Sequence, residues 1–307
     1  MIASKNILKL FVFLLFIILG LFSMNSNEIT VNSKLKDTIF TTKNDTILVE
    51  RDIKIKSYFK YMDSIVNAYD SLTDYKLSEH LLVRFNPWIL DSLKNTDYYL
   101  MMKKDSFVYN QKELIVLHKG SRLIIPNEKF ADSMLNSFSK TFIEINIPEF
   151  KLRIYEDSIQ RFEFPVRVGR NERKYLKMGD RITNLKTKTG IGSIVDHVKN
   201  PDFYNPVNGK KYFYTIRDDN KTTKMPQIPW LVTEVNNVRN GQLIHPTTNP
   251  VTLSKAYSNG CIGTKEADAW VIYYYAPIGT KLIIKYNLNV TNEKGKNVVL
   301  KNIYGVK

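Results

Sequence analysis

From Thr141 onward the chain alternates apolar and polar side chains, and this pattern limits the possible folds more than any other feature. Residues 141–147 alternate strictly, and residues 151–155 and 162–168 follow with short turns between them. A two-residue period is typical of strands with one buried face. The pattern therefore predicts the start of an antiparallel sheet. Later elements are expected as strands at 212–217, 231–235 and 280–286, a helix at Glu266–Tyr275, and a hairpin within 288–307.

The segment before this sheet has the spacing of helices. Apolar residues recur at helical intervals from Tyr58 to Leu72, a second helix is expected from Ser78 to Phe85, and Trp88–Leu93 suggests one more helical turn. Two short strands, 114–117 and 123–126, are expected around a turn. The sequence thus predicts a small, mostly helical domain at 57–138 in front of a β-rich one.

The N-terminus has the pattern of an export segment. Lys5 and Lys9 precede an apolar run from Leu10 to Phe22, which resembles the positive and apolar regions of a signal peptide. The run is short for a spanning helix, which needs about 20 residues, yet no clear cleavage site follows. Residues 1–24 are therefore expected to be a signal peptide or membrane anchor, followed by a polar spacer at 25–56 with one short strand. We expect the protein in the periplasm or cell envelope, held at the inner membrane if the segment is not cleaved.

The chain is strongly basic, with 45 Lys and Arg against 30 Asp and Glu. Segment 167–188 concentrates this charge and is expected to be a solvated, flexible loop; an alternative is attraction to anionic wall polymers. Because the chain has an export signal and no recognition motif, no nucleic-acid partner is expected.

The single cysteine, Cys261, is the candidate nucleophile. It follows a Ser-Asn-Gly turn and precedes the expected helix, an environment that should lower the pKa of its thiol. His245, upstream at the end of a strand, is the candidate base. The backbone amides of Gly260 and Cys261 are candidate oxyanion-hole donors. The alternatives are an inert buried thiol and a core histidine.

These residues resemble the motif of the YkuD-type L,D-transpeptidases, which cross-link or trim bacterial peptidoglycan. Ile244-His245 matches the first element of the family pattern, and Ser258, Gly260, Cys261 and Ile262 match the second. The resemblance extends over about 141–286. It implies an α+β chain: a mainly β catalytic domain at 141–287 with mixed sheets and one or two short helices, behind the helical domain and followed by a C-terminal β-hairpin extension at 288–307.

Three positions depart from the family pattern. Asn259 replaces the motif histidine, Gly263 replaces the motif arginine, and Pro246 follows His245 where the family has glycine or serine. Asn259 can form hydrogen bonds but cannot titrate. Pro246 keeps a carbonyl that could orient the imidazole. Because Gly263 stands in place of the motif arginine, the residue that the resemblance implies for aligning the substrate is absent at this position.

The resemblance implies a cysteine mechanism on stem tetrapeptides. Cys261 would form a thioester with the donor peptide, and His245 would take and return the proton. Gly260, Ser258 and Asn259 would shape the turn and the oxyanion hole, and Pro246 would orient His245. An amine acceptor gives cross-links, whereas water gives carboxypeptidase action. No metal and no organic cofactor are implied.

Other functions stay open. Asn86-Pro87 and the segment 119–126 weakly resemble the end of a LysM module, which would let the helical domain bind glycan strands. With its altered motif, the protein could instead be a non-catalytic peptidoglycan-binding scaffold. A third possibility is a cysteine peptidase that cuts cross-links. The membrane would be a partner only through an uncleaved N-terminal segment.

Overall fold

A computed structural model of the chain describes residues 45–292 and 294–306. The expected signal or anchor at 1–24 and the spacer up to residue 44 lie outside the described residues. The described residues form one compact unit. In the described part, no helix has both the length and the apolar character needed to cross a membrane.

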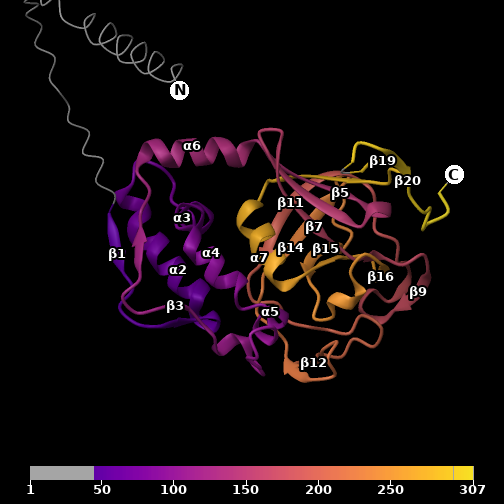
Figure 1. Ribbon diagram of the computed structural model, residues 1–307, viewed down its shortest axis with the longest axis horizontal. Helices are drawn as coiled ribbons and strands as arrows, with labels where there is room; N and C mark the ends of the chain where they lie inside the picture. Colours follow the sequence, from indigo (N-terminus) through magenta and orange to yellow (C-terminus); the bar gives the residue numbers. More distant parts are fainter. Residues whose placement is uncertain (1–44, 293, 307) are drawn as a thin grey trace, which may run out of the picture. The chain divides into compact units, whose positions relative to one another are not determined.

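An eight-stranded sheet is the centre of the second half of the chain (Figure 1). Its strand order is β17-β15-β14-β11-β18-β5-β6-β7. The strands are β5 (Thr141–Asn146), β6 (Lys151–Glu156), β7 (Ile159–Pro165), β11 (Gly190–Val198), β14 (Trp230–Val235), β15 (Leu243–Pro246), β17 (Ile262–Thr264) and β18 (Lys281–Lys285).

The sheet is mixed, as the resemblance implied. Strands β5, β6 and β7 pair antiparallel in sequence order, which confirms the expectation from their alternating residues. Strand β18 pairs parallel with β5, and β17 pairs parallel with β15. Alternate residues of β5 and β6 are fully buried, including Ile143, Ile145, Leu152 and Ile154.

Helices dominate the first half of the described chain. The expected helices at 58–72 and 78–85 are confirmed, and Ser78 caps the second one by accepting a hydrogen bond from the Leu81 amide at 3.2 Å. The helix at 128–139 was not expected, although Asn127 caps it in the same way. The helices are α2 (Ile55–Tyr69), α3 (Glu79–Phe85), α4 (Pro87–Lys94), α5 (Tyr98–Met102) and α6 (Glu128–Ser139).

Four short strands accompany these helices: β1 (Thr46–Leu48), β2 (Ile53–Lys54), β3 (Ile115–Leu117) and β4 (Arg122–Ile124). The two strands expected around a turn are confirmed as β3 and β4. They do not pair with each other, because β4 pairs with β1 and β3 pairs with β2. Asn86 contributes to this arrangement. Its side chain bonds both backbone groups of Ile124 at 2.8 and 2.9 Å, so it ties the end of α3 to β4.

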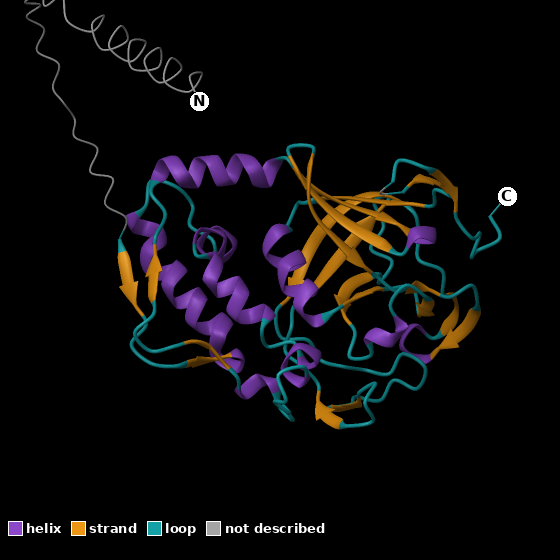
Figure 2. Ribbon diagram, viewed as in Figure 1, coloured by secondary structure: helices purple, strands orange, loops and turns teal. Residues whose placement is uncertain are grey.

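Helix α7 (Glu266–Tyr275) matches the expected range and lies between the two halves (Figure 2). It contacts α3 and α4 on one side and β14 and β15 on the other. Trp270 is fully buried in it, as expected of a core residue. The helix therefore joins the helical region and the sheet into one core.

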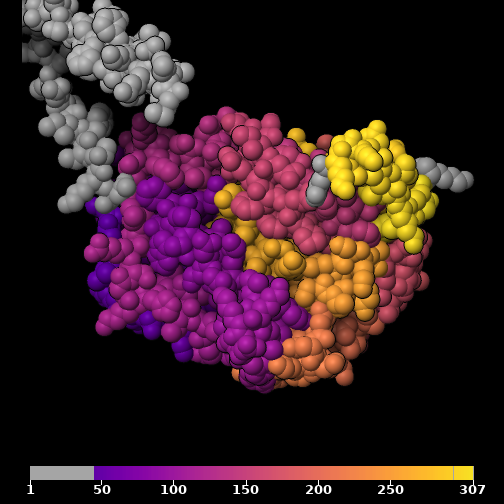
Figure 3. Space-filling model, in the orientation of Figure 1, coloured from indigo at the N-terminus to yellow at the C-terminus, as the bar shows by residue number. Residues whose placement is uncertain are grey.

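The remaining strands are short pairs. The basic segment forms an antiparallel hairpin, so the expectation of a flexible loop is wrong. The C-terminal hairpin occurs as expected, and in Figure 3 it lies at the surface. The pairs are β9 (Arg173–Leu176) with β10 (Arg181–Asn184), β12 (Tyr214–Ile216) with β13 (Thr222–Lys224), β16 (Ala256–Ser258) with β8 (Val168–Gly169), and β19 (Asn289–Thr291) with β20 (Asn297–Val299).

Candidate active site

Cys261 lies in the tight turn that joins β16 to β17. Gly260 has a φ of +113°, a conformation that side-chain-bearing residues rarely adopt. Ser258 closes the turn, because its hydroxyl donates to the Cys261 carbonyl at 2.6 Å and accepts from the Gly260 amide at 3.2 Å. The Gly260 amide is a predicted oxyanion-hole donor. To act as one, it would have to give up its hydrogen bond to the Ser258 hydroxyl and donate to the substrate oxygen instead.

The parallel ladder brings His245 close to the turn that carries Cys261. His245 is paired with Gly263 across β15 and β17. Cys261 lies in the turn directly before β17, two residues from Gly263. Strand spacing and rise put the two Cα atoms roughly 8 Å apart. A separation of that order is within the combined reach of a thiol and an imidazole side chain, and the catalytic pairing of the two residues stays a prediction.

Backbone and aromatic contacts orient the imidazole of His245. Its Nδ1 lies 2.8 Å from the Pro246 carbonyl oxygen, which can only accept a hydrogen bond. The Nδ1 atom therefore carries the proton, and Nε2 is left as the basic atom. The ring packs against Trp230, with centroids 5.3 Å apart, and Trp230 packs edge-on against Phe203.

The pKa shifts of His245 and Cys261 favour a neutral imidazole and a neutral thiol before substrate binds. Burial, with a contribution from Arg167, lowers the pKa of His245 to about 4. Burial raises the pKa of the Cys261 thiol, while the Leu243 backbone and Arg167 act in the opposite direction. The expected lowering of the thiol pKa is therefore wrong. The expected lowering relied on the N-terminus of α7, but strand β17 lies between Cys261 and that helix in the sequence.

Arg167 is a cation of the site that the sequence did not single out. Its backbone pairs with Gly263 through two hydrogen bonds of 2.9 and 3.0 Å. A Cβ atom on Gly263 would lie 2.4 Å from Nε of Arg167. The Arg167 side chain thus occupies the space that a side chain at position 263 would need.

The guanidinium of Arg167 is only partly satisfied. One nitrogen donates to Thr252 Oγ1 at 3.2 Å, and the buried Nε has no hydrogen-bond partner in the described structure. Its charge favours the ionised form of Cys261 and the neutral form of His245. In the sequence, Arg167 is one polar residue between two buried valines. Arg167 reaches the site only because its backbone forms a β-bridge with Gly263 of β17.

Asn259 is held by a neighbouring arginine. Its side-chain oxygen accepts a hydrogen bond from Arg170 at 2.6 Å. This bond ties the turn to the residue after β8, and the shaping role of Asn259 stays a prediction.

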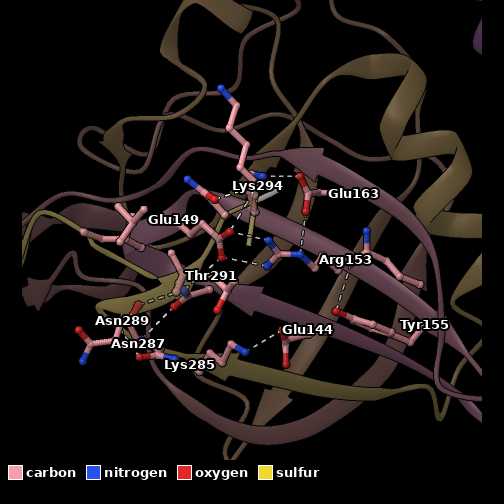
Figure 4. Close-up of a pocket in the computed structure, with 17 residues that line it drawn as sticks. Glu144, Glu149, Arg153, Tyr155, Glu163, Lys285, Asn287, Asn289, Thr291 and Lys294 are labelled. Atoms are coloured by element: carbon pink, nitrogen blue, oxygen red, sulfur yellow. Dashed lines mark hydrogen bonds and ion pairs between the residues drawn. The ribbon is translucent and has the colours of Figure 1, made fainter. Parts of the chain in front are cut away.

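A larger cavity, of about 980 Å³, lies apart from the catalytic motif, between β5–β7 and the C-terminal hairpin (Figure 4). Its charged residues are largely paired with each other: Arg153 bonds Glu149 and Glu163, and Lys285 pairs with Glu144. Since its lining includes none of the predicted catalytic residues, this cavity has no part in the candidate site. Among residues 45–292 and 294–306, no cluster of His, Cys, Asp and Glu could hold a metal ion.

Comparison with known proteins identifies the class of the second half of the chain. Residues 140–284 match the YkuD family model, the L,D-transpeptidase catalytic domain. This part of the chain therefore belongs to the YkuD family, as its motif suggested. No curated protein matches the chain.

Solved structures similar to this chain include three L,D-transpeptidases. One from Mycobacterium tuberculosis H37Rv is 15% identical over 48% of this chain and 57% of that one, with a TM-score of 0.32. One from Mycobacterium smegmatis is 13% identical over 48% and 58%, with a TM-score of 0.32. One from Xylanimonas cellulosilytica is 13% identical over 78% and 97%, with a TM-score of 0.35. The chain spans little more than half the length of the first two.

Proposed function

We propose that the protein is an exported peptidoglycan L,D-transpeptidase that works through a thioester on Cys261. The observation that supports this proposal is the register of β15 and β17, which pairs His245 with Gly263, two residues from Cys261, inside a YkuD domain. The substrates would be stem tetrapeptides, and the products cross-links or shortened stems. The export segment and any glycan binding by the helical region belong to the proposal as well.

The proposed first step couples proton transfer to attack. The Cys261 sulfur attacks the donor carbonyl as His245 Nε2 takes the thiol proton, because both groups are neutral at rest. Negative charge then develops on the carbonyl oxygen, where the Cys261 amide and the nearby Arg167 cation would stabilise it. The imidazolium returns its proton to the departing amine of D-alanine, which leaves a thioester.

The proposed second step resolves this thioester. His245 removes a proton from an acceptor amine or from water, and the nucleophile displaces the Cys261 thiolate, which recovers its proton. Pro246 keeps the imidazole in the productive tautomer throughout, since its carbonyl holds the Nδ1 proton.

Incubation with tetrapeptide muropeptides tests the proposal. The wild-type protein should release D-alanine, and the Cys261→Ala variant should release none. Retained binding to sacculi without release by either protein would instead support the non-catalytic scaffold.

A further inference from the structure

A second cavity, of about 360 Å³, opens directly beside the catalytic turn. Asn259 and Gly260 of the turn are part of its wall, as is Gly241, whose carbonyl oxygen lies 3.9 Å from the Cys261 sulfur. The rest of the wall comes from the β9–β10 hairpin, from the segment after it, and from the two neighbours of Gly241 in the loop before β15. The full lining is Arg173, Arg181, Ile182, Thr183, Asn184, Lys186, Lys188, Asn240, Gly241, Gln242, Asn259 and Gly260.

All the charged side chains that line this cavity are positive. Four lining residues are cations (Arg173, Arg181, Lys186 and Lys188), and none is an aspartate or glutamate. Within the described residues, none of the four forms an ion pair with a carboxylate; Lys186 donates to the Tyr304 carbonyl at 3.0 Å. A concave surface lined by uncompensated cations concentrates positive potential and attracts anions.

Gln242 adds an independent sign of a missing ligand. Its side chain is 4% exposed, and its Oε1 accepts a hydrogen bond from the Lys188 amide at 2.8 Å. That bond fixes the orientation of the amide group. Its Nε2 is buried and has no partner in the described structure. Buried donors are nearly always satisfied, and the atom that would satisfy this one is an acceptor.

We propose that this cavity binds a carboxylate of the donor peptide and thereby positions the peptide for attack by Cys261. The Gln242 amide would donate to one carboxylate oxygen, and Arg173 and Arg181 would supply most of the attraction. The identity of the peptide rests on the proposed function, because stem peptides carry free carboxylates on their glutamate and diamino-acid residues. The presence of an anion site depends only on the cavity.

Binding to the Cys261→Ala protein tests the proposal without turnover. Titration calorimetry would compare a stem tetrapeptide with the same peptide amidated at its glutamate and diamino-acid carboxylates. We expect the free acid to bind at least tenfold more tightly, with an advantage that shrinks as salt rises. Equal affinity for the two peptides would contradict the proposal.

Matched charge variants locate the binding site. Arg173→Gln with Arg181→Gln removes two exposed cations of the cavity and should weaken binding about tenfold. The control, Lys129→Gln with Lys281→Gln, removes two exposed cations that do not line the cavity and should change affinity less than twofold. Equal losses in the two variants would mean that only net charge matters, and would overturn the assignment.

Gln242→Glu tests the buried donor, because it replaces Nε2 by a carboxylate oxygen with little change in volume. We expect a loss of affinity of tenfold or more. If this variant fails to fold, the exposed arginine pair still decides the question. Inorganic phosphate serves as the competing probe, and displacement of the peptide by phosphate more readily than by glutarate would overturn the choice of a carboxylate ligand.

The cavity and the proposed function can fail separately. If the wild-type protein releases no D-alanine but the arginine variants lose carboxylate binding, the anion site stands and the transpeptidase function does not. If D-alanine is released with the same KM by wild type and arginine variants, the function stands and the cavity proposal is wrong.

Discussion

At the scale of single residues, the candidate site is a neutral thiol and a neutral imidazole next to one cation. Burial favours the uncharged form of both Cys261 and His245. Thiolate formation at rest is therefore unfavourable, and charge separation should accompany the attack itself. Arg167 is close enough to both groups to lower the pKa of each.

The pH dependence of turnover follows from His245. Only the neutral imidazole can accept the thiol proton, and the pKa of His245 is about 4. We expect kcat/KM to stay constant from pH 7 down to about pH 5 and to fall with an apparent pKa near 4. A stopped assay of D-alanine release across this range measures it. Half-loss near pH 6.5, the ordinary value for histidine, would contradict the burial argument.

The same reasoning applies to the thiol. Burial raises the pKa of Cys261, so alkylation by iodoacetamide should have its inflection above the usual value of about 8.5. Replacing Arg167 by methionine should move the inflection further up, since a favourable charge is lost. An inflection below pH 8 would show that the turn activates the thiol after all.

Arg167 and Gly263 should behave as an interacting pair. Gly263→Arg alone introduces a Cβ atom 2.4 Å from Arg167 Nε, and Arg167→Gly alone removes the cation, so each should lower kcat/KM by about tenfold or more. The double variant Arg167→Gly with Gly263→Arg removes the clash and restores a cation. Its kcat/KM should exceed that of both single variants. A folded double variant no better than either single one would contradict this account of Arg167.

At the scale of elements, Thr187 joins the basic segment to the catalytic turn. Its hydroxyl accepts from the Gly169 amide at 2.8 Å and donates to the Gly260 carbonyl at 2.9 Å. Gly169 must be glycine, because a Cβ atom there would lie 1.9 Å from the Leu185 carbonyl oxygen. The position of the turn therefore depends on a strand and a loop that are distant in sequence.

Thr187→Val tests this connection. It leaves the buried Gly169 amide and the partly buried Gly260 carbonyl without this partner, at a cost of about 1–3 kcal/mol for the buried group. The change should lower kcat by loosening the turn. Thr280→Val is the matched control, since Thr280 is also buried and donates to the Pro277 carbonyl at 2.7 Å. Urea denaturation and D-alanine release should show lost stability in both variants and lost activity in Thr187→Val alone. Equal activity in the two variants would contradict the connection.

The elements also show what the sequence could predict. Alternation gave the strands, and the apolar run with two acids in its first turn gave α7. The motif spacing predicts the Cys261–His245 pair, which remains a prediction. Three features required tertiary structure. Strand β4 pairs with β1 and is tied to α3 by Asn86. Arg167 reaches the site through a β-bridge. The surroundings of the partly buried thiol come from residues remote in sequence.

At the scale of the whole molecule, a buried polar network ties the helical region to the catalytic domain. Arg217 and Glu266 form an ion pair of 2.5 Å with almost no exposed side-chain surface. Gln111 donates to Glu266 at 2.7 Å and accepts from Arg217 at 2.8 Å. The Tyr98 amide also donates to Glu266. The two regions should therefore unfold together.

Glu266→Gln should destabilise the protein by about 3–5 kcal/mol, because it leaves a buried arginine without its counter-ion. Asp157→Asn is the control: it removes an exposed ion pair with Lys140, which should contribute less than about 1 kcal/mol. Urea denaturation followed by circular dichroism and tryptophan fluorescence measures both variants. A loss below 1 kcal/mol for Glu266→Gln, or separate transitions for the two signals, would show that the network does not couple the regions.

The most direct test of the central claim is mass spectrometry of protein quenched during reaction with a stem tetrapeptide. The account predicts one covalent adduct, with the mass of the peptide minus D-alanine, mapped to Cys261 and absent from the Cys261→Ala variant. Release of D-alanine by that variant, or an adduct on any other residue, would contradict it.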